Sequence, residues 1–173
     1  MSGPFSEEDW SERPDWPLAQ NGATNLFFRE TVLDEAIADL KALDYAILEV
    51  NCETMDTFLY SVSVGFDWQN QFGYQLSRPN LDAINDGLRT PPFPTSKRLA
   101  VVGRGIDRLK QENERFTSGF LDIFEYQARD ALLFGGLMLG LFQANDPLFS
   151  TDTLGGRAAR FNPKEWLNAS RGV

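Results

Sequence analysis

The apolar positions along the chain alternate between helical spacing and short continuous runs. Residues 33–43 place leucine, isoleucine and alanine at i, i+3, i+4, i+7 and i+10, which predicts an amphipathic helix. The same spacing predicts further helices at residues 55–62, 81–88 and 117–134. We expect Thr31 or Asp34 to cap the first of these helices, Thr54 the second and Asn80 the third.

Three nearly continuous apolar runs lie between these helices, at residues 45–50, 99–102 and 137–142. A strand covered by helices on both faces shows such a run. Strands that alternate with helices pair in parallel through crossovers. The pattern therefore predicts an α/β fold with a small three-stranded parallel sheet flanked by helices. Residues 25–28 are either a further short strand or a lead-in segment.

The two ends of the chain differ from this middle part. Residues 1–24 contain three prolines and several acids, so we expect an extended arm, with Trp10 and Trp16 packed on the surface. Residues 151–173 are rich in basic residues, and we expect a solvated tail with a docked final turn. The expected organisation is an arm at residues 1–24, one domain at residues 25–150 and a tail at residues 151–173.

Composition and charge narrow the class of protein. Hydrophobic residues make up 42% of the chain and aromatic residues 13%, which is enough for a packed core. The formal net charge of −9 repels nucleic acid and anionic membranes and attracts basic partners. The apolar run at residues 131–142 is too short to span a bilayer, and the N-terminus lacks a signal pattern. We therefore expect a cytoplasmic protein that binds neither nucleic acid nor membrane.

The content of cysteine and histidine excludes several kinds of chemistry. The chain has one cysteine, Cys52, and no histidine. A single cysteine forms no internal disulfide, in keeping with a reducing compartment, and we expect Cys52 to be a small buried residue at a strand end. Without histidine, Ser-His and Cys-His catalytic pairs and His-ligated metal sites are excluded. We expect no cofactor.

One short acidic helix, at residues 80–88, carries the most informative pattern. Its apolar stripe consists of Leu81, Ile84 and Leu88. Asp82 and Asp86 are four residues apart, so both carboxylates leave the helix on another side. Like charges at this spacing destabilise a helix by about 0.2–0.5 kcal/mol, which Arg89 offsets in part. The pair is either a solvated acidic face or a negative surface shaped for a cationic partner.

A motif extends from this helix into the loop before it. It consists of Phe72-Gly73, then Asn80-Leu81-Asp82-Ala83, then Asp86 and Leu88. This motif resembles the binding segment of the barstar family of intracellular ribonuclease inhibitors, and the order of helices and strands at residues 31–147 is similar. The resemblance implies a small parallel sheet with flanking helices. It also implies inhibition by occlusion, in which the family's helix and preceding loop enter a nuclease active site and carboxylates replace RNA phosphates.

The resemblance also implies a set of partner-binding residues. Asp86 matches the family's central carboxylate and Asp82 the second one. Asn85 and Gln71 stand at positions that are aromatic in barstar. The resemblance thus implies that Asp82, Asp86, Asn85 and Gln71 belong to the partner-binding surface.

Two further parts of the chain depart from the family pattern or extend it. Tyr126 and Asp130 stand on the long helix at two positions that are acidic in the family. Residues 74–79 lengthen the loop, and Tyr74 is a candidate for the missing aromatic contact. Phe120, Phe124 and Phe134 are expected in the core, whereas Trp68 is either a surface anchor or a core residue.

Three functions are compatible with the sequence. The first is a barstar-like inhibitor or immunity protein, not an enzyme and monomeric when free, that occludes a basic ribonuclease or nuclease-type toxin. The second is a barstar-fold interaction module without an inhibitory role. The third is an enzyme in which Asp82 and Asp86 form a metal or acid–base pair, and it lacks a third ligand in the sequence.

Overall fold

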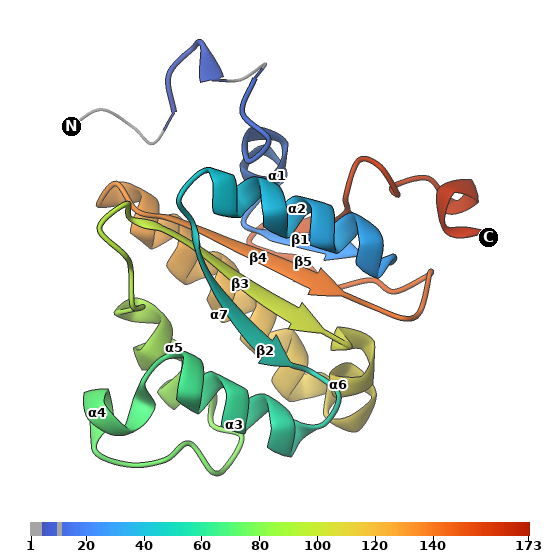
Figure 1. Cartoon of the computed structure of the whole chain (residues 1–173). Helices are drawn as coiled ribbons and strands as arrows, with labels where there is room; N and C mark the ends of the chain where they lie inside the picture. The colour runs from blue at the N-terminus through green and yellow to red at the C-terminus, as the bar shows by residue number, and fades with distance from the viewer. Residues whose placement is uncertain (1–4, 10–11) are drawn as a thin grey trace.

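The computed structural model describes residues 5–9 and 12–173, and within them a five-stranded parallel sheet forms the centre of the fold. The order across the sheet is β2-β3-β4-β1-β7, and Figure 1 shows β2, β3, β4 and β1 in this order. The strands are β1 (Thr24–Phe27), β2 (Ala46–Asn51), β3 (Arg98–Arg104), β4 (Leu137–Gln143) and β7 (Arg160–Phe161). The predicted α/β class with a parallel sheet flanked by helices is confirmed. The predicted number of three strands is wrong, because β1 and β7 extend the sheet beyond β4.

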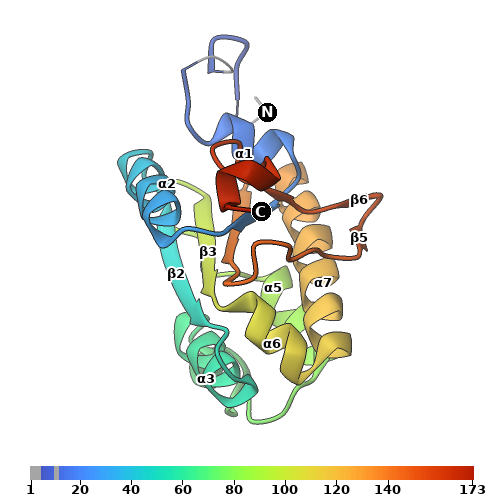
Figure 2. The ribbon, with the colours of Figure 1, turned by 90° about the vertical axis from the view of Figure 1, so that its right-hand side faces the viewer.

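Helices cover both faces of this sheet (Figure 2). On one face, α1 (Trp16–Gln20) and α2 (Glu30–Ala42) enclose a core cluster that includes Leu33, Ile37 and Leu40. The other face is covered by α3 (Met55–Gly65), α5 (Leu81–Arg89), α6 (Ile106–Glu112) and α7 (Glu114–Leu133), with the short α4 (Trp68–Phe72) beside α3. The larger core cluster lies on this second face. The periodic pattern of the sequence does not predict α1, α4 or α6.

Two of the three predicted helix N-caps are confirmed. Thr54 accepts a hydrogen bond from the Thr57 N–H in a reciprocal capping box, and Asn80 caps α5. The expectation of Thr31 or Asp34 as a cap of α2 is wrong, because α2 begins at Glu30 after Arg29. The carboxylate of Glu165 accepts hydrogen bonds from the N–H groups of Phe28 and Arg29, both at 2.8 Å, just before that helix.

Residues 12–23, the described stretch directly before β1, do not form the predicted extended arm. Within this stretch, α1 buries Leu18, and Asp15 is completely buried. The Asp15 carboxylate accepts hydrogen bonds from Tyr45 Oη at 2.6 Å and from Arg13 Nη2 at 2.6 Å. These bonds attach the segment to the start of β2, while Trp10 lies outside the described residues.

The C-terminal segment also forms regular structure. It contains the hairpin of β5 (Thr153–Leu154) and β6 (Arg157–Ala158), strand β7, and the 3-10 helix η2 (Asn168–Arg171). Arg171 is buried, and its Nη1 donates to the Glu165 carbonyl at 2.6 Å. Part of this basic segment is therefore built into the fold.

The core confirms most of the predicted apolar positions. Phe120, Phe124 and Cys52 are buried as expected, and Trp68, left open between surface and core, is 1% exposed. Phe134 is 68% exposed, so its predicted place in the core is wrong. It follows the last residue of α7 and caps that helix. No helix in the described part of the chain is long and apolar enough to cross a membrane.

Candidate functional site

The acidic helix α5 starts at a well-formed cap. The side-chain oxygen of Asn80 accepts hydrogen bonds from the N–H groups of Asp82, at 3.0 Å, and Ala83, at 3.2 Å. These bonds satisfy two of the N–H groups that a helix leaves unpaired at its start. The cap therefore sets where the helix begins and on which side Asp82 leaves it.

One face of α5 is fixed by packing against the core. Ile84 and Leu88 are buried, as the apolar stripe predicted, and Gly87 lies directly against the ring of Trp68. A Cβ atom on Gly87 would be 2.3 Å from Trp68 Cζ3, so only glycine allows this approach. Trp68 thus acts as the support of the acidic helix.

The second support of α5 is the long helix α7, which lies beside it (Figure 1). Leu81 fills the space left by the missing side chain of Gly119, where a Cβ would lie 2.5 Å from Leu81 Cδ1. The amide Nε2 of Gln127 donates a hydrogen bond to Asn85 Oδ1 at 2.8 Å. Asn85, an expected partner-binding residue, therefore uses its oxygen to join the two helices.

Asp82 and Asp86 lie on the exposed side of α5. In residues 5–9 and 12–173, no ion pair within 4.0 Å joins either carboxylate to a basic side chain, and Arg89 pairs with neither of them. Both carboxylates therefore remain available to a partner, while the helix that carries them is held by Trp68 and Gln127.

The two candidate residues on α7 lie one helical turn apart. Tyr126 is 66% exposed and Asp130 is half-buried. They flank Gln127 in the sequence, and Gln127 contacts α5. The structure therefore places Tyr126 and Asp130 on the helix that packs against α5.

The two candidate residues before α5 are also connected to it. Tyr74 is 48% exposed, and its ring lies 6.4 Å from that of Trp68, edge to face. Because Trp68 contacts Gly87, this arrangement links Tyr74 to the acidic helix. Gln71 is exposed, but its Nε2 donates to the Phe66 carbonyl, so part of its polar group is used within the chain.

Sequence reasoning did not identify Gln127 and Trp68 as residues that position the site. A polar side chain next to Ala128 in the buried stripe of α7 was a possible signal for Gln127, which is 3% exposed. A glycine inside a short helix was a possible signal for a large neighbouring ring at Gly87.

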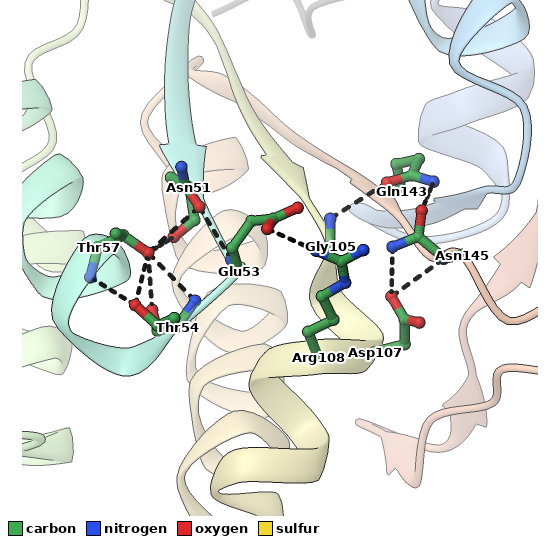
Figure 3. A network of polar contacts seen from close by, with 9 residues as sticks. All are labelled: Asn51, Glu53, Thr54, Thr57, Gly105, Asp107, Arg108, Gln143 and Asn145. Atoms are coloured by element: carbon green, nitrogen blue, oxygen red, sulfur yellow. Dashed lines mark hydrogen bonds and ion pairs between the residues drawn. The ribbon is translucent and has the colours of Figure 1, made fainter.

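A second polar group lies at the carboxyl ends of β2, β3 and β4, the edge where parallel α/β sheets commonly bind ligands. Figure 3 shows its members, Asn51, Glu53, Thr54, Thr57, Gly105, Asp107, Arg108, Gln143 and Asn145. Gln143 Oε1 accepts from the Gly105 N–H at 3.1 Å, and Asp107 Oδ1 accepts from the Asn145 N–H at 3.0 Å. The polar side chains at this edge thus form hydrogen bonds within the protein. The described residues contain no group of three or more acidic or thiol side chains that could hold a metal ion.

Cys52 lies next to this edge and is completely buried. Burial, with a smaller effect of the Asp107 charge, raises the pKa of the Cys52 thiol far above its ordinary value. The thiol therefore stays protonated at neutral pH, a state that is a poor nucleophile. Cys52 is a packing residue of the strand end, as predicted.

Comparison with known proteins does not assign the chain to a family. No protein-family model matches the chain, and no curated protein is significantly similar to it in sequence. The functional assignment therefore depends on α5 and the residues around it.

Proposed function

We propose that this protein is a barstar-like inhibitor that uses α5 to occlude the active site of a basic ribonuclease or nuclease-type toxin. The observation that carries the proposal is the pair Asp82 and Asp86, exposed on one helix and without an ion partner in the described part of the chain. Like charges at this spacing destabilise a helix, and a lysine at either position would relieve the repulsion. The pair is therefore better explained by a cationic partner than by folding.

In this proposal the two carboxylates occupy the positions that RNA phosphates take in the nuclease. A carboxylate accepts hydrogen bonds from arginine and lysine side chains as a phosphate does, and such charged bonds are the stronger kind. The net charge of −9 accelerates association with a basic protein at low salt. The inhibitor is expected to act in the cytoplasm and to be monomeric before it binds.

The packing of α5 favours tight binding by a small surface. Because Trp68 and Gln127 already fix the helix, little conformational freedom is lost on binding. The exposed rings of Tyr74 and Tyr126 supply the kind of aromatic contacts that often dominate protein interfaces. Residues 74–79 lengthen the loop before α5 and distinguish this surface from that of barstar.

A second candidate function is a barstar-fold interaction module that inhibits no nuclease. Two internal hydrogen bonds favour it, since Asn85 is joined to Gln127 and Gln71 to the Phe66 carbonyl. Both positions are aromatic contact positions in barstar, and here they contribute to the fold. An enzyme with Asp82 and Asp86 as a metal pair remains the weakest of the three functions, since a third ligand near them is missing from the described residues.

The experiment that separates the first two functions is affinity capture from lysate and secreted protein of the source cell. The baits are the wild type, the variant Asp82→Asn/Asp86→Asn and the matched control Glu35→Gln/Asp39→Asn. The control removes two exposed acids at the same spacing from α2, on the opposite face of the sheet. The proposal predicts a basic nuclease retained by wild type and control and lost from the α5 variant. Retention of a partner without nuclease activity would favour the interaction module.

A further inference from the structure

A groove of about 330 Å³ lies between the last turns of α7, the starts of β1 and β4, the end of α1 and the β5–β6 hairpin. Its volume falls within the range of about 300–1,000 Å³ typical of small-molecule sites. None of the residues proposed above to bind a partner lines it. The groove is therefore a separate candidate site, and its argument does not depend on the proposed function.

The floor of the groove is apolar, and both ends of the chain help to build its walls. Ala128, Leu132 and Met138 supply apolar surface from α7 and β4. Gln20 comes from α1 and Arg157 from the β5–β6 hairpin, so segments on either side of the main sheet converge here. Their convergence leaves an apolar hollow with a polar rim.

The charged residues of the groove favour an anion. Its lining holds Arg129, Arg157 and Glu125, a local net charge of 2 − 1 = +1 in a chain whose net charge is −9. Within residues 5–9 and 12–173, the one hydrogen bond of the Arg157 side chain is a long one of 3.5 Å, from Nη1 to the Gln20 carbonyl. An anion in the groove would therefore gain a guanidinium partner that the fold uses weakly.

Glu125 and Arg129 pair with each other, so the charge that remains for an anion in the groove is that of Arg157. Glu125 is buried and accepts hydrogen bonds from the N–H groups of Ala23, at 3.1 Å, and Thr24, at 2.9 Å. Its Oε1 also lies 3.6 Å from Arg129 Nε. Glu125 thus forms the fixed inner wall of the groove and attaches the start of β1 to α7.

The main chain of Met138 supplies a further unpaired donor. The Gly140 N–H donates to the Ala23 carbonyl at 2.7 Å, so Met138, two residues earlier in β4, also directs its N–H and C=O toward β1. The ladder does not continue, because the Ala23 N–H bonds to Glu125 instead. Met138 is 1% exposed, and outside the strand ladders its main-chain groups make no hydrogen bond within the described residues.

Buried main-chain groups without partners are rare and cost free energy. A ligand that brings an oxygen atom to the Met138 N–H would satisfy a donor that the fold leaves open. The apolar floor, the arginine rim and the unpaired N–H thus point to one kind of molecule.

We propose that this groove binds a small amphipathic carboxylate. Its apolar body packs on Ala128 and Leu132, and its carboxylate pairs with Arg157, with the Met138 N–H as a further donor. Neither Asp82 nor Asp86 lines the groove.

The test uses 8-anilinonaphthalene-1-sulfonate, a fluorescent anion with an apolar body, with octanoate as competitor. The groove variants are Leu132→Asp and Arg157→Gln, and the matched controls are Leu133→Asp and Arg160→Gln. Each control makes the same change at an exposed residue outside the groove. We expect one dye molecule per wild-type chain, displaced by octanoate. The groove variants should bind the dye about tenfold more weakly, and the controls should match the wild type.

Circular dichroism first establishes that each variant is folded. If Leu132→Asp does not fold, the comparison of Arg157→Gln with Arg160→Gln tests the proposal. Both arginines are exposed, so neither change should prevent folding. Absence of saturable dye binding to the wild type would overturn the proposal. It would also be overturned by failure of octanoate to displace the dye, or by controls that weaken binding as much as the groove variants do.

Discussion

The side-chain oxygen of Asn85 accepts a 2.8 Å hydrogen bond from Nε2 of Gln127, and this bond joins the acidic helix α5 to α7. Gln127 is 3% exposed, so its amide has little access to water. The two helices also pack closely along their length. The bond therefore helps to hold Asp82 and Asp86 in a fixed position relative to α7.

Asn85→Ala should lower the free energy of unfolding by about 1–3 kcal/mol, because the buried amide of Gln127 then lacks its acceptor. Gln127→Leu in the same background should restore part of that loss. Urea unfolding of the two single variants and the double variant measures the coupling between the residues. A coupling below about 0.5 kcal/mol would contradict a direct interaction.

Gly87→Ala should destabilise the protein by about 2 kcal/mol, an overpacking cost of about 3 kcal/mol less the helix-propensity gain of about 1 kcal/mol for alanine. The added Cβ would lie 2.3 Å from the ring of Trp68, which is buried and cannot turn away. The matched control is Gly119→Ala, where the nearest atom belongs to the flexible, half-buried Leu81 side chain and the loss should be smaller. Thermal unfolding of both variants checks this, and a Gly87→Ala variant as stable as the wild type would show that Trp68 does not restrain α5.

Tyr45→Phe should cost about 1.5–3 kcal/mol, because the buried Asp15 carboxylate loses a hydrogen bond from Tyr45 Oη. The segment before α1 should then be cut faster in limited proteolysis. Tyr60→Phe is the control, since Tyr60 is 72% exposed and should change stability by less than about 0.5 kcal/mol. Equal proteolysis of both variants and the wild type would mean that Asp15 does not hold this segment.

Stability should fall at alkaline pH. Burial raises the pKa of Cys52, and burial together with the hydrogen bond to Asp15 raises the pKa of Tyr45. Both groups hold their protons more tightly in the folded state. Their contribution is therefore complete below the unfolded-state values of about 8.5 for cysteine and about 10 for tyrosine, and is lost as pH rises above them.

The free energy of unfolding, measured from pH 7 to pH 10.5, should decrease by up to about 1.4 kcal/mol per pH unit once the cysteine of the unfolded chain ionises. Cys52→Ala should remove the decrease between about pH 8.5 and pH 10, whatever its effect on stability at pH 7. An unchanged slope in that variant would show that Cys52 ionises as easily in the folded chain as in the unfolded one.

The sequence predicted the elements whose signals are local. Strands β2, β3 and β4 follow from continuous apolar runs, and the caps Thr54 and Asn80 follow from the residue types at their positions. β7 has two residues, too few for a periodic signal, and β1 has four. The start of α2 was wrong because its neighbouring N–H groups are satisfied by Glu165, a residue far along the chain.

The features of the candidate site that depend on local spacing were also predicted, whereas those that depend on packing between helices were not. The exposure of Asp82 and Asp86 and the burial of Ile84 follow from helical spacing alone. The bond between Asn85 and Gln127 depends on how α5 packs on α7, which no local pattern contains. Phe134 was misplaced because α7 ends at Leu133, and the side chain of the capping residue no longer follows the buried stripe.

The central claim is that Asp82 and Asp86 bind the active site of a basic nuclease. Its most direct test is a titration of the captured nuclease, acting on a fluorogenic RNA, with wild type, Asp82→Asn/Asp86→Asn and Glu35→Gln/Asp39→Asn. The account predicts stoichiometric inhibition by wild type and control and at least about hundredfold weaker inhibition by the α5 variant, a loss of about 2.7 kcal/mol. Equal inhibition by all three proteins would contradict the claim.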